Sequence, residues 1–282
     1  MKSTIVNLID KLCRTGFVIY LLSCSSILFA QQEGKDLPFQ SGEQLNYNIH
    51  YKYGIVMAKA GTAQYDVKDN TFRGKPAIRT SLTFKTTGVV DKAFKIRDTL
   101  VAYSTPALIP VFHRKFLHEG KAHYVEEIDY KTFSPTLTSV RSKRYTSETV
   151  KFDTLLTANS VGFDMLNIFI FVRALDYSKL KAGDTFKMAS FVGKEVVPLN
   201  VRCMGQSIID KGNTKYKTLR FEIDIVDPAF EESKTAMEIW ISDDNNRIPI
   251  KLKAKLKIGA AEAEIASTKN LKHPFDSMIK IK

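Results

Sequence analysis

Alternation of apolar and polar residues with a period of two runs through most of this chain and limits it to a β-rich fold. In LNYNIHYKYGI, alternate positions fall on one face of a strand: Leu45, Tyr47, Ile49, Tyr51 and Tyr53. The same period returns in RTSLTFKTT, KIRDTLVAY, KTLRFEIDIV, AMEIWIS and RIPIKLKAKLKI, and Gly-, Asn- and Asp-rich turn signals separate these segments. Many strands joined by short connections predict an antiparallel sheet.

One segment, NSVGFDMLNIFIFVRALDYSKLKAGD, departs from this period and predicts a helix over about 160–176. Asn159 or Ser160 is the expected N-cap, and the helix should end before Gly183. Its apolar residues fall near helical spacing and cover most sides, so the helix should be well covered: Phe163, Leu166, Ile170 and Ala174.

The expected organisation is a single β-rich domain over 41–270, with the helix between two sets of strands. About seven strands over 41–155 precede the helix, and about six over 184–268 follow it. The predicted fold is mainly β: a large curved antiparallel sheet or partly closed β-barrel with one central helix, which protects the sheet edges. We expect a short linker at 31–40 and a basic tail at 271–282.

The N-terminus has the layout of a secretory signal peptide over 1–30. A basic region precedes an apolar run that is too short for a bilayer span, which needs about 20 residues. Cleavage after Ala30, leaving Gln31 first, is the favoured interpretation. The alternative is lipidation of Cys24, because LLSC resembles a lipobox, and an uncleaved anchor is a third outcome. The predicted location is the periplasm, with tethering to the outer membrane if Cys24 carries lipid.

Three cysteines are present, and two of them lie in the targeting segment. Cleavage at Ala30 leaves Cys203 alone, which excludes an intramolecular disulfide or a zinc cage built on cysteine. Cys203 lies in the strand-like segment PLNVRCMG and is expected to be a small buried apolar residue. No apolar stretch of membrane length follows the N-terminal one, so no transmembrane segment is expected in the mature chain.

The net charge of +12 comes from basic residues spread over strand-like segments, as in KLKAKLK. A solvated basic face is the simplest interpretation, and an anionic partner such as a lipid headgroup or an acidic glycan is the alternative. Zinc-finger spacing and aromatic–basic RNA motifs are absent from the sequence, so we expect no nucleic-acid partner.

The segment FHRKFLHEGKAHYVEEIDY places three histidines five residues apart and raises the question of a metal site. We expect a hairpin instead, with its turn at HEGK, Phe116 roughly opposite His123, and His118 at the turn. A spacing of five sends His113 and His118 to opposite faces of one strand, whereas metal ligands must converge on one point. We therefore expect exposed polar histidines at a hairpin, and Ile128 and Tyr130 facing inward.

Sequence motifs for catalysis are lacking, and no catalytic residue, metal ligand or cofactor is predicted. Nucleophile-elbow, phosphate-loop, dinucleotide and zinc-protease patterns do not occur. Paired acids occur at Glu126–Glu127, Glu231–Glu232 and Asp243–Asp244, but neighbouring strand residues point to opposite faces, so solvated turn acids are expected. A lyase that leaves no sequence signature stays open.

Two quoted segments resemble a known family. GEQLNYNIHYKYGIVMAKAGTA at 42–63 joins a Tyr-rich strand to a Gly-Ile turn and an Ala-Gly strand, and EIWISDDNNRIPIKLKAKL at 238–256 closes one strand and opens the next. With a signal peptide in front and a helix in the middle, the chain resembles the exported bacterial family DUF3108, of unknown function. The resemblance implies a β-rich envelope protein and carries no catalytic residues.

The chemistry of the turn that follows Trp240 indicates a structural role. Asp243 and Asp244 can accept backbone N–H bonds, Arg247 can pair with one of them, and Pro249 fixes the exit.

Three functions remain open on the sequence. The first is a non-enzymatic binding or carrier module for an amphiphilic ligand, such as a lipid or a lipoprotein acyl chain, held in an apolar cavity of about 300 Å³ or more. The second is a scaffold with a protein partner in an envelope assembly, which predicts an exposed apolar patch or open sheet edge. The third, less favoured, is an enzyme acting on acidic polysaccharide. Ligand, partner and oligomeric state are not set by the sequence.

Overall fold

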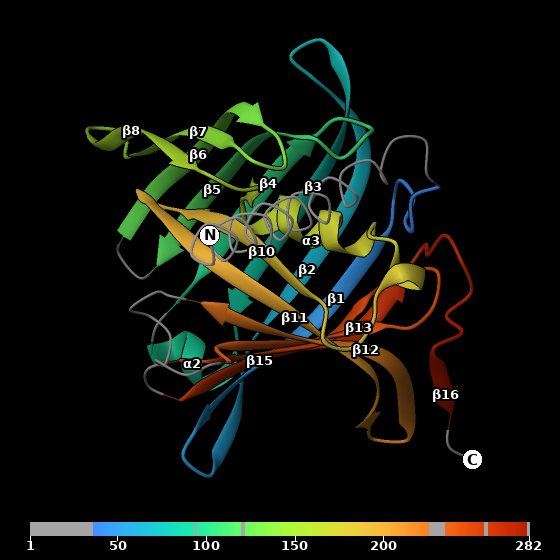
Figure 1. Ribbon diagram of the computed structural model, residues 1–282. Coiled ribbons are helices and arrows are strands. Elements are labelled where there is room, and N and C mark those ends of the chain that lie inside the picture. The colour runs from blue at the N-terminus through green and yellow to red at the C-terminus, as the bar shows by residue number, and fades with distance from the viewer. Residues whose placement is uncertain (1–35, 94, 120–121, 226–234, 257–258, 281–282) are drawn as a thin grey trace, which may run out of the picture.

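The computed structural model describes residues 36–93, 95–119, 122–225, 235–256 and 259–280, and this part of the chain is mainly β, as expected (Figure 1). Fifteen strands follow one another in one hydrogen-bonded path, and β16 adds to β12 beside that path. The expected signal peptide and its processing residues, Cys24, Ala30 and Gln31, lie outside the described residues. Within the described residues, no helix has the length and apolar character needed to cross a membrane.

Nine strands and helix α2 occupy the described chain up to residue 163. They are β1 (Gln44–Tyr53), β2 (Val56–Phe72), β3 (Lys75–Thr86), α2 (Gly88–Ala93), β4 (Arg97–Ser104), β5 (Pro110–Glu119), β6 (Ala122–Phe133), β7 (Thr138–Tyr145), β8 (Val150–Ala158) and β9 (Gly162–Phe163). The remaining elements are α3 (Met165–Arg173), the 3-10 turn η1 (Tyr177–Lys179), β10 (Thr185–Val192), β11 (Glu195–Lys211), β12 (Thr214–Ile225), β13 (Met237–Ser242), β14 (Pro249–Lys255), β15 (Ala260–Lys269) and β16 (Met278–Lys280).

The sheet curls until its two ends meet. Its strand order is β8-β7-β6-β5-β4-β3-β2-β1-β15-β14-β13-β12-β11-β10-β9, so the path begins and ends on strands that follow each other in sequence. All ladders are antiparallel except the short parallel pairing of β9 with β10. Because the chain passes directly from β8 into β9, it carries one end of the path across to the other. The result is a nearly closed, barrel-like sheet.

Side chains, rather than a ladder, hold this seam together. Thr138 on β7 donates its hydroxyl to the Ser160 carbonyl at 3.1 Å and accepts the Gly162 N–H at 2.9 Å. An apolar cluster crosses the seam and joins residues of β6, β7, β8 and β10, with members Ile128, Val140, Ala158, Ala189 and Phe191. The seam thereby joins the two ends of the path, although the outer edge of β8 has no ladder partner among the described residues.

Helix α3 lies between the two halves of the curled sheet (Figure 1). Leu166 and Ile170 pack into the core cluster that contains Tyr65 and Leu100, and Phe171 packs into a second cluster with Phe163. Burial of large aliphatic and aromatic side chains from the helix and both halves of the sheet stabilises this arrangement.

The helix is shorter than the expected span of 160–176. Asp164 is its N-cap and accepts the backbone N–H groups of Leu166 and Asn167, both at 3.0 Å. The expected caps, Asn159 and Ser160, precede the helix, because the next residues form strand β9 instead. Apolar residues before Asp164 therefore pack as part of the sheet, and their helical spacing is misleading.

The described parts of the expected linker and tail, residues 36–40 and 271–280, both pack against the domain. Phe39 is buried and belongs to the main core cluster. Leu271, Phe275 and Met278 pack against the same cluster, and β16 pairs with β12. The apolar residues of these two short segments become buried where they cover the barrel, and this burial stabilises the fold. The basic residues beside them in the sequence make the segments look like solvent-exposed chain.

Candidate functional site

The histidine hairpin forms as β5 and β6, but its register differs from the expected one. His118 lies opposite His123, and Val125 lies opposite Phe116, so the expected pairing of Phe116 with His123 is wrong. The centroids of the two paired imidazole rings are 4.6 Å apart, and both side chains are exposed. The difference arises because the hairpin is centred one residue later in the sequence than the expected turn, so that Glu119 pairs with Ala122.

His113 lies on the inner face, opposite Ile128, and only 5% of it is exposed. This corrects the expectation that the hairpin histidines are exposed. Neither ring nitrogen has a hydrogen-bond partner among the described residues. Burial lowers the pKa of His113, against the opposite effect of the Asp164 carboxylate. His113 therefore faces the core while the other two rings face outward, and the described residues contain no group of three His, Cys, Asp or Glu that could hold a metal ion.

The turn after Trp240 gathers the predicted polar residues. Asp244 accepts the backbone N–H groups of Asn246, Arg247 and Ser277 at 3.0, 3.3 and 3.2 Å. Arg247 pairs with Asp243 at 3.3 Å and takes a left-handed backbone, with φ of 52°. On the geometry of this turn we infer a structural role for Asp243, Asp244 and Arg247.

Cys203 is buried and free, and burial raises the pKa of its thiol.

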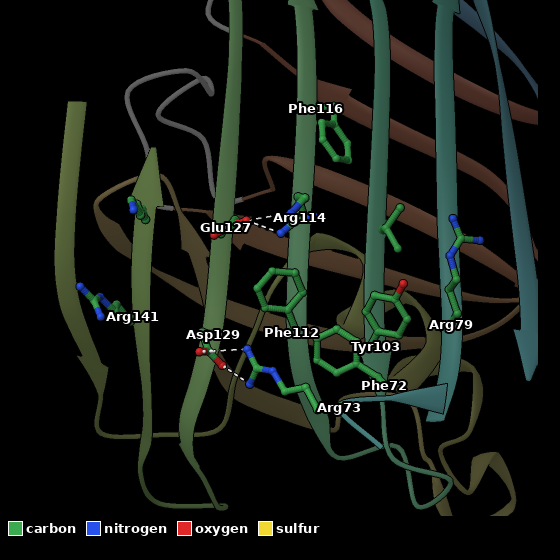
Figure 2. Close-up of a pocket in the computed structure, with 12 residues that line it drawn as sticks. Phe72, Arg73, Arg79, Tyr103, Phe112, Arg114, Phe116, Glu127, Asp129 and Arg141 are labelled. Carbon is green, nitrogen blue, oxygen red and sulfur yellow. Dashed lines mark hydrogen bonds and ion pairs between the residues drawn. The ribbon is translucent and has the colours of Figure 1, made fainter. Parts of the chain in front are cut away.

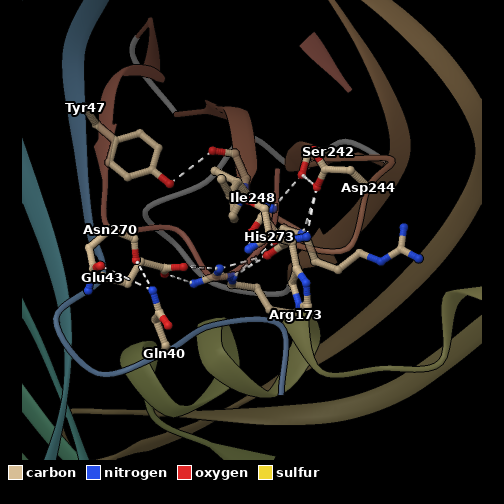
Figure 3. A network of polar contacts seen from close by, with 12 residues as sticks. Gln40, Glu43, Tyr47, Arg173, Ser242, Asp244, Ile248, Asn270 and His273 are labelled. Carbon is tan, nitrogen blue, oxygen red and sulfur yellow. Dashed lines mark hydrogen bonds and ion pairs between the residues drawn. The ribbon is translucent and has the colours of Figure 1, made fainter. Parts of the chain in front are cut away.

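A buried ion pair beside this turn has no local signal in the sequence. Arg173, at the end of α3, donates to the Glu43 carboxylate at 2.5 and 3.0 Å, and both side chains are fully buried (Figure 3). Arg173 also donates to the carbonyl of Asn246 at 2.8 Å. Burial alone would lower the pKa of Arg173, but the Glu43 carboxylate outweighs it and raises the pKa. All three nitrogens of this guanidinium thus donate to acceptors of the protein.

A groove of about 550 Å³ lies on the outer face of the sheet, across β3 to β7 and the end of β2 (Figure 2). The strand positions between its residues, including Leu100, Ala102 and Val140, are buried in the core, so the groove residues face outward. The residues that line it are Phe72, Arg73, Arg79, Val101, Tyr103, Phe112, Arg114, Phe116, Glu127, Asp129, Arg141 and Lys143. Five basic and two acidic residues give the lining a net charge of +3.

Stacked rings form the floor of the groove. The ring of Phe72 lies 4.2 Å from that of Tyr103 and 5.4 Å from that of Phe112, centroid to centroid. Arginines lie over this stack: the Arg73 guanidinium is 5.0 Å from the Phe72 ring, and that of Arg114 is 5.3 Å from the Phe112 ring. Such stacking holds the guanidinium planes while leaving apolar ring surface beside them.

Acidic residues on β6 fix these two arginines. Arg73 binds both Asp129 oxygens at 3.0 and 3.2 Å, and Arg114 binds Glu127 at 2.6 Å (Figure 2). Partial burial would raise the pKa of Asp129, but hydrogen bonds from Arg73 and Lys131 outweigh it and lower the pKa. The carboxylate therefore stays ionised and the pair stays neutral as a whole.

Arg79 and Lys143 differ from the other cations of the groove, since among the described residues neither forms an ion pair with a carboxylate. Arg79 contacts only the Ser81 hydroxyl, at 3.2 Å, and Lys143 lies over the Tyr145 ring at 5.2 Å. Arg141, by contrast, binds Asp153 at 2.7 and 2.9 Å. The groove thus combines an apolar floor with two cations that are available to an anion.

Sequence reasoning missed the groove because its residues come from separate strands. Each residue shows only as an outward position of an alternating pattern, and the groove forms through the register of six neighbouring strands. A usable signal is the repeated choice of arginine and aromatic residues at outward positions, where small polar residues would serve equally well.

Comparison with known proteins decides the family. The model of the family described as "Protein of unknown function (DUF3108)" matches residues 46–266, which confirms the resemblance seen in the sequence. The chain belongs to the DUF3108 family. No curated protein matches this DUF3108 chain.

One solved structure supports the barrel-like fold, and two others match with lower TM-scores. A β-barrel-like protein of the domain of unknown function DUF1849 from Brucella abortus is similar, with a TM-score of 0.53 and 12% identity, over 83% of this chain and 100% of that one. A protein from Bacteroides fragilis, provisionally described as exported and with a YmcC-like fold, has a TM-score of 0.32 and 10% identity over 83% and 98% of the two chains. A protein from Parabacteroides distasonis, provisionally described as a lipoprotein, has a TM-score of 0.27 and 9% identity over 83% and 100%. At these identities the first neighbour speaks for the fold alone.

Proposed function

We propose that this DUF3108 protein is an exported, periplasmic cell-envelope protein that binds an amphiphilic ligand with an anionic group and catalyses no reaction. The ligand site is the outer-face groove. Export is supported by the basic and apolar N-terminal segment, with cleavage after Ala30 as the favoured route and lipidation of Cys24 as the alternative.

The observation that carries the proposal is the pairing of an aromatic floor with unpaired cations. An apolar chain gains by covering the exposed parts of the Phe72, Tyr103 and Phe116 rings. The anionic end of the same molecule gains from Arg79 and Lys143, neither of which forms an ion pair with a described carboxylate. A ligand that lacks either part would lose one of the two contributions.

The site differs in place from the internal cavity that the sequence suggested. Helix α3 contributes Leu166, Ile170 and Phe171 to the core clusters that occupy the inside of the sheet. The second depression described, about 420 Å³ beside β1 to β4, is lined by polar residues such as Asn46 and Gln64 and lacks the stacked floor. The outer groove is therefore the better place for an amphiphile.

Native mass spectrometry of the protein purified from an envelope fraction without detergent tests this function. We expect a discrete added mass that organic solvent removes. In Arg79→Gln/Lys143→Gln the adduct should be lost, and in the control Lys187→Gln/Lys194→Gln, which changes the same total charge on β10 and the turn after it, it should remain. A bare polypeptide mass for the unmodified protein would contradict the proposal.

A scaffold role is the second candidate and rests on the outer edge of β8. Strand β8 begins the path of the sheet, and no ladder partner is described on that side. Val150 and Leu155 on this strand are 57% and 65% exposed. A photoreactive residue at 155 would then give one discrete cross-linked product in intact cells, whereas the same residue at 208 would not. Equal products at the two positions would remove this candidate.

A further inference from the structure

The tip of the β1–β2 hairpin exposes an apolar cluster that the groove does not use. Ile55 is 100% exposed, Val56 63% and Met57 50%. The hairpin extends away from the body of the barrel, as the blue loop at the bottom of Figure 1 shows. Three adjacent large apolar side chains on a projecting turn are a costly arrangement in water.

The pairing of the strands explains why these side chains are exposed. Strand β2 begins to pair with β3 only at Gly61, and the Ala60 carbonyl accepts the Thr87 N–H, so among the described residues Val56 to Lys59 have a ladder partner on β1 alone. Alternate residues of this free segment face opposite sides, and both sides are apolar at the tip. The cluster is therefore a knob presented to something outside the protein rather than an edge of the core.

Basic residues surround the knob. Lys52 and Lys59 flank it on the two strands and are exposed. At the same end of the barrel, helix α2 packs beside β2, and Lys92 and Lys95, at its end and just after it, are exposed. An apolar tip with lysines behind it matches the layering of an anionic bilayer, where acyl chains lie beneath charged headgroups.

We propose that the tip formed by Ile55, Val56 and Met57 inserts into the surface of an anionic lipid bilayer, while Lys52 and Lys59 lie at the headgroups. Only the tip enters, because each of the two strands carries one of these lysines within three residues of the tip. The contact holds the barrel to the membrane at one end.

This inference does not depend on the groove. Strand β2 carries the tip at its start, Val56, and a groove residue at its end, Phe72. A 17-residue strand spans roughly 50 Å, so the two features lie at opposite ends of the barrel. Either can fail in an experiment without affecting the other.

Vesicle co-sedimentation tests the inference with three forms of the full chain. All forms carry Cys24→Ser, so that lipid on that residue cannot hold them, and are purified from the soluble fraction. The tip variant is Ile55→Ser/Val56→Ser/Met57→Ser. The matched control is Leu155→Ser/Met204→Ser/Ile208→Ser, which removes three apolar side chains that are 65%, 43% and 62% exposed elsewhere. The vesicles are an equal mixture of phosphatidylglycerol and phosphatidylethanolamine, compared with phosphatidylcholine alone.

We expect the Cys24→Ser protein with its natural tip to bind the anionic vesicles. The tip variant should bind them at least about tenfold more weakly than the matched control does. Phosphatidylcholine should bind more weakly than the anionic mixture, since it lacks net charge. Equal binding of the tip variant and the control, or no binding by the unmodified tip, would overturn the inference.

Fluorescence provides the measure of insertion. The chain has one tryptophan, Trp240, so an Ile55→Trp variant adds a single new emitter whose signal is the difference from the unmodified protein. Its emission should shift to the blue when anionic vesicles are added, because the indole enters an apolar layer. If the Ile55→Trp variant binds the vesicles and its emission does not shift, the lysines alone hold the protein at the membrane surface. This outcome also overturns insertion.

Discussion

Arg173 and Glu43, 130 positions apart in the sequence, form a bidentate ion pair that no solvent reaches. The pair joins the end of helix α3 to the turn that enters β1. Arg173 also binds the Asn246 carbonyl, so three distant segments meet on one guanidinium. Since the helix fills the inside of the sheet, this contact fixes how the helix sits in the barrel (Figure 3).

Replacing Arg173 with methionine should lower the free energy of unfolding by about 3–5 kcal/mol. The change leaves the Glu43 carboxylate buried without a counter-charge, which costs more than the pair itself contributes. Urea denaturation measures the loss. The double variant Arg173→Met/Glu43→Leu should recover part of it, because no charge is then buried. A double variant as unstable as the sum of two single losses would contradict this explanation.

Asp244→Ala should destabilise the fold by about 2–4 kcal/mol, because the two oxygens of the Asp244 carboxylate accept three backbone N–H groups. Its neighbour provides the control, since the Asp243 carboxylate binds the side chains of Arg247 and Gln206 and its loss should cost less than about 1 kcal/mol. Thermal unfolding of the two variants compares them. Equal shifts in Tm would argue against a structural role for Asp244.

His113 should make stability depend on pH below about 7. Burial lowers its pKa, with Lys115 acting in the same direction and Asp164 and Glu126 opposing. The unfolded chain therefore takes up a proton near pH 6.5 that the folded chain resists, and the free energy of unfolding falls as pH decreases. For one such group the slope cannot exceed about 1.4 kcal/mol per pH unit.

His113→Leu should keep the stability at pH 7.5 and flatten this dependence, since both ring nitrogens lack described partners. His123→Gln, at an exposed position, should leave the slope unchanged. Urea denaturation at a series of pH values gives both results. If the two variants have the same slope, the dependence comes from other groups.

Gly61→Ala should destabilise the sheet by about 2 kcal/mol or more. A Cβ at this position would lie 2.4 Å from the Lys85 carbonyl oxygen and 3.0 Å from the Phe84 ring, and backbone cannot give way cheaply. Ala58→Ser, on the exposed part of the same strand, should change stability by less than about 0.5 kcal/mol. A neutral Gly61→Ala in urea denaturation would show that β2 and β3 can shift apart.

Much of the fold could be predicted from alternation, and its closure could not. Leu45 and Tyr47 face the core as their period indicates, and Ile128 and Tyr130 also face inward. Closure depends on Thr138 reaching Ser160 and Gly162 across the seam, which is a contact between strands that no local pattern encodes. The helix was placed too early because apolar residues before Asp164 fit both periods.

The candidate site was out of reach for the same reason. Phe72 and Phe112 stack, yet the strands that carry them are brought together only by the register of the sheet. The histidines drew attention through regular spacing, although spacing along one strand says little about which side chains meet. His113 is the clearest case in which spacing along the sequence fails to predict a side chain's environment, because the burial of His113 depends on residues of other strands.

The affinity of the groove for an anionic amphiphile tests the central claim most directly. Calorimetric titration of monomeric dodecyl phosphate into the unmodified protein, and into Arg79→Gln/Lys143→Gln, compares the site with and without its unpaired cations. We predict that dodecyl phosphate binds in preference to dodecyl maltoside, and that the double variant binds it at least about tenfold more weakly. Equal affinity of the two proteins for dodecyl phosphate would contradict the account.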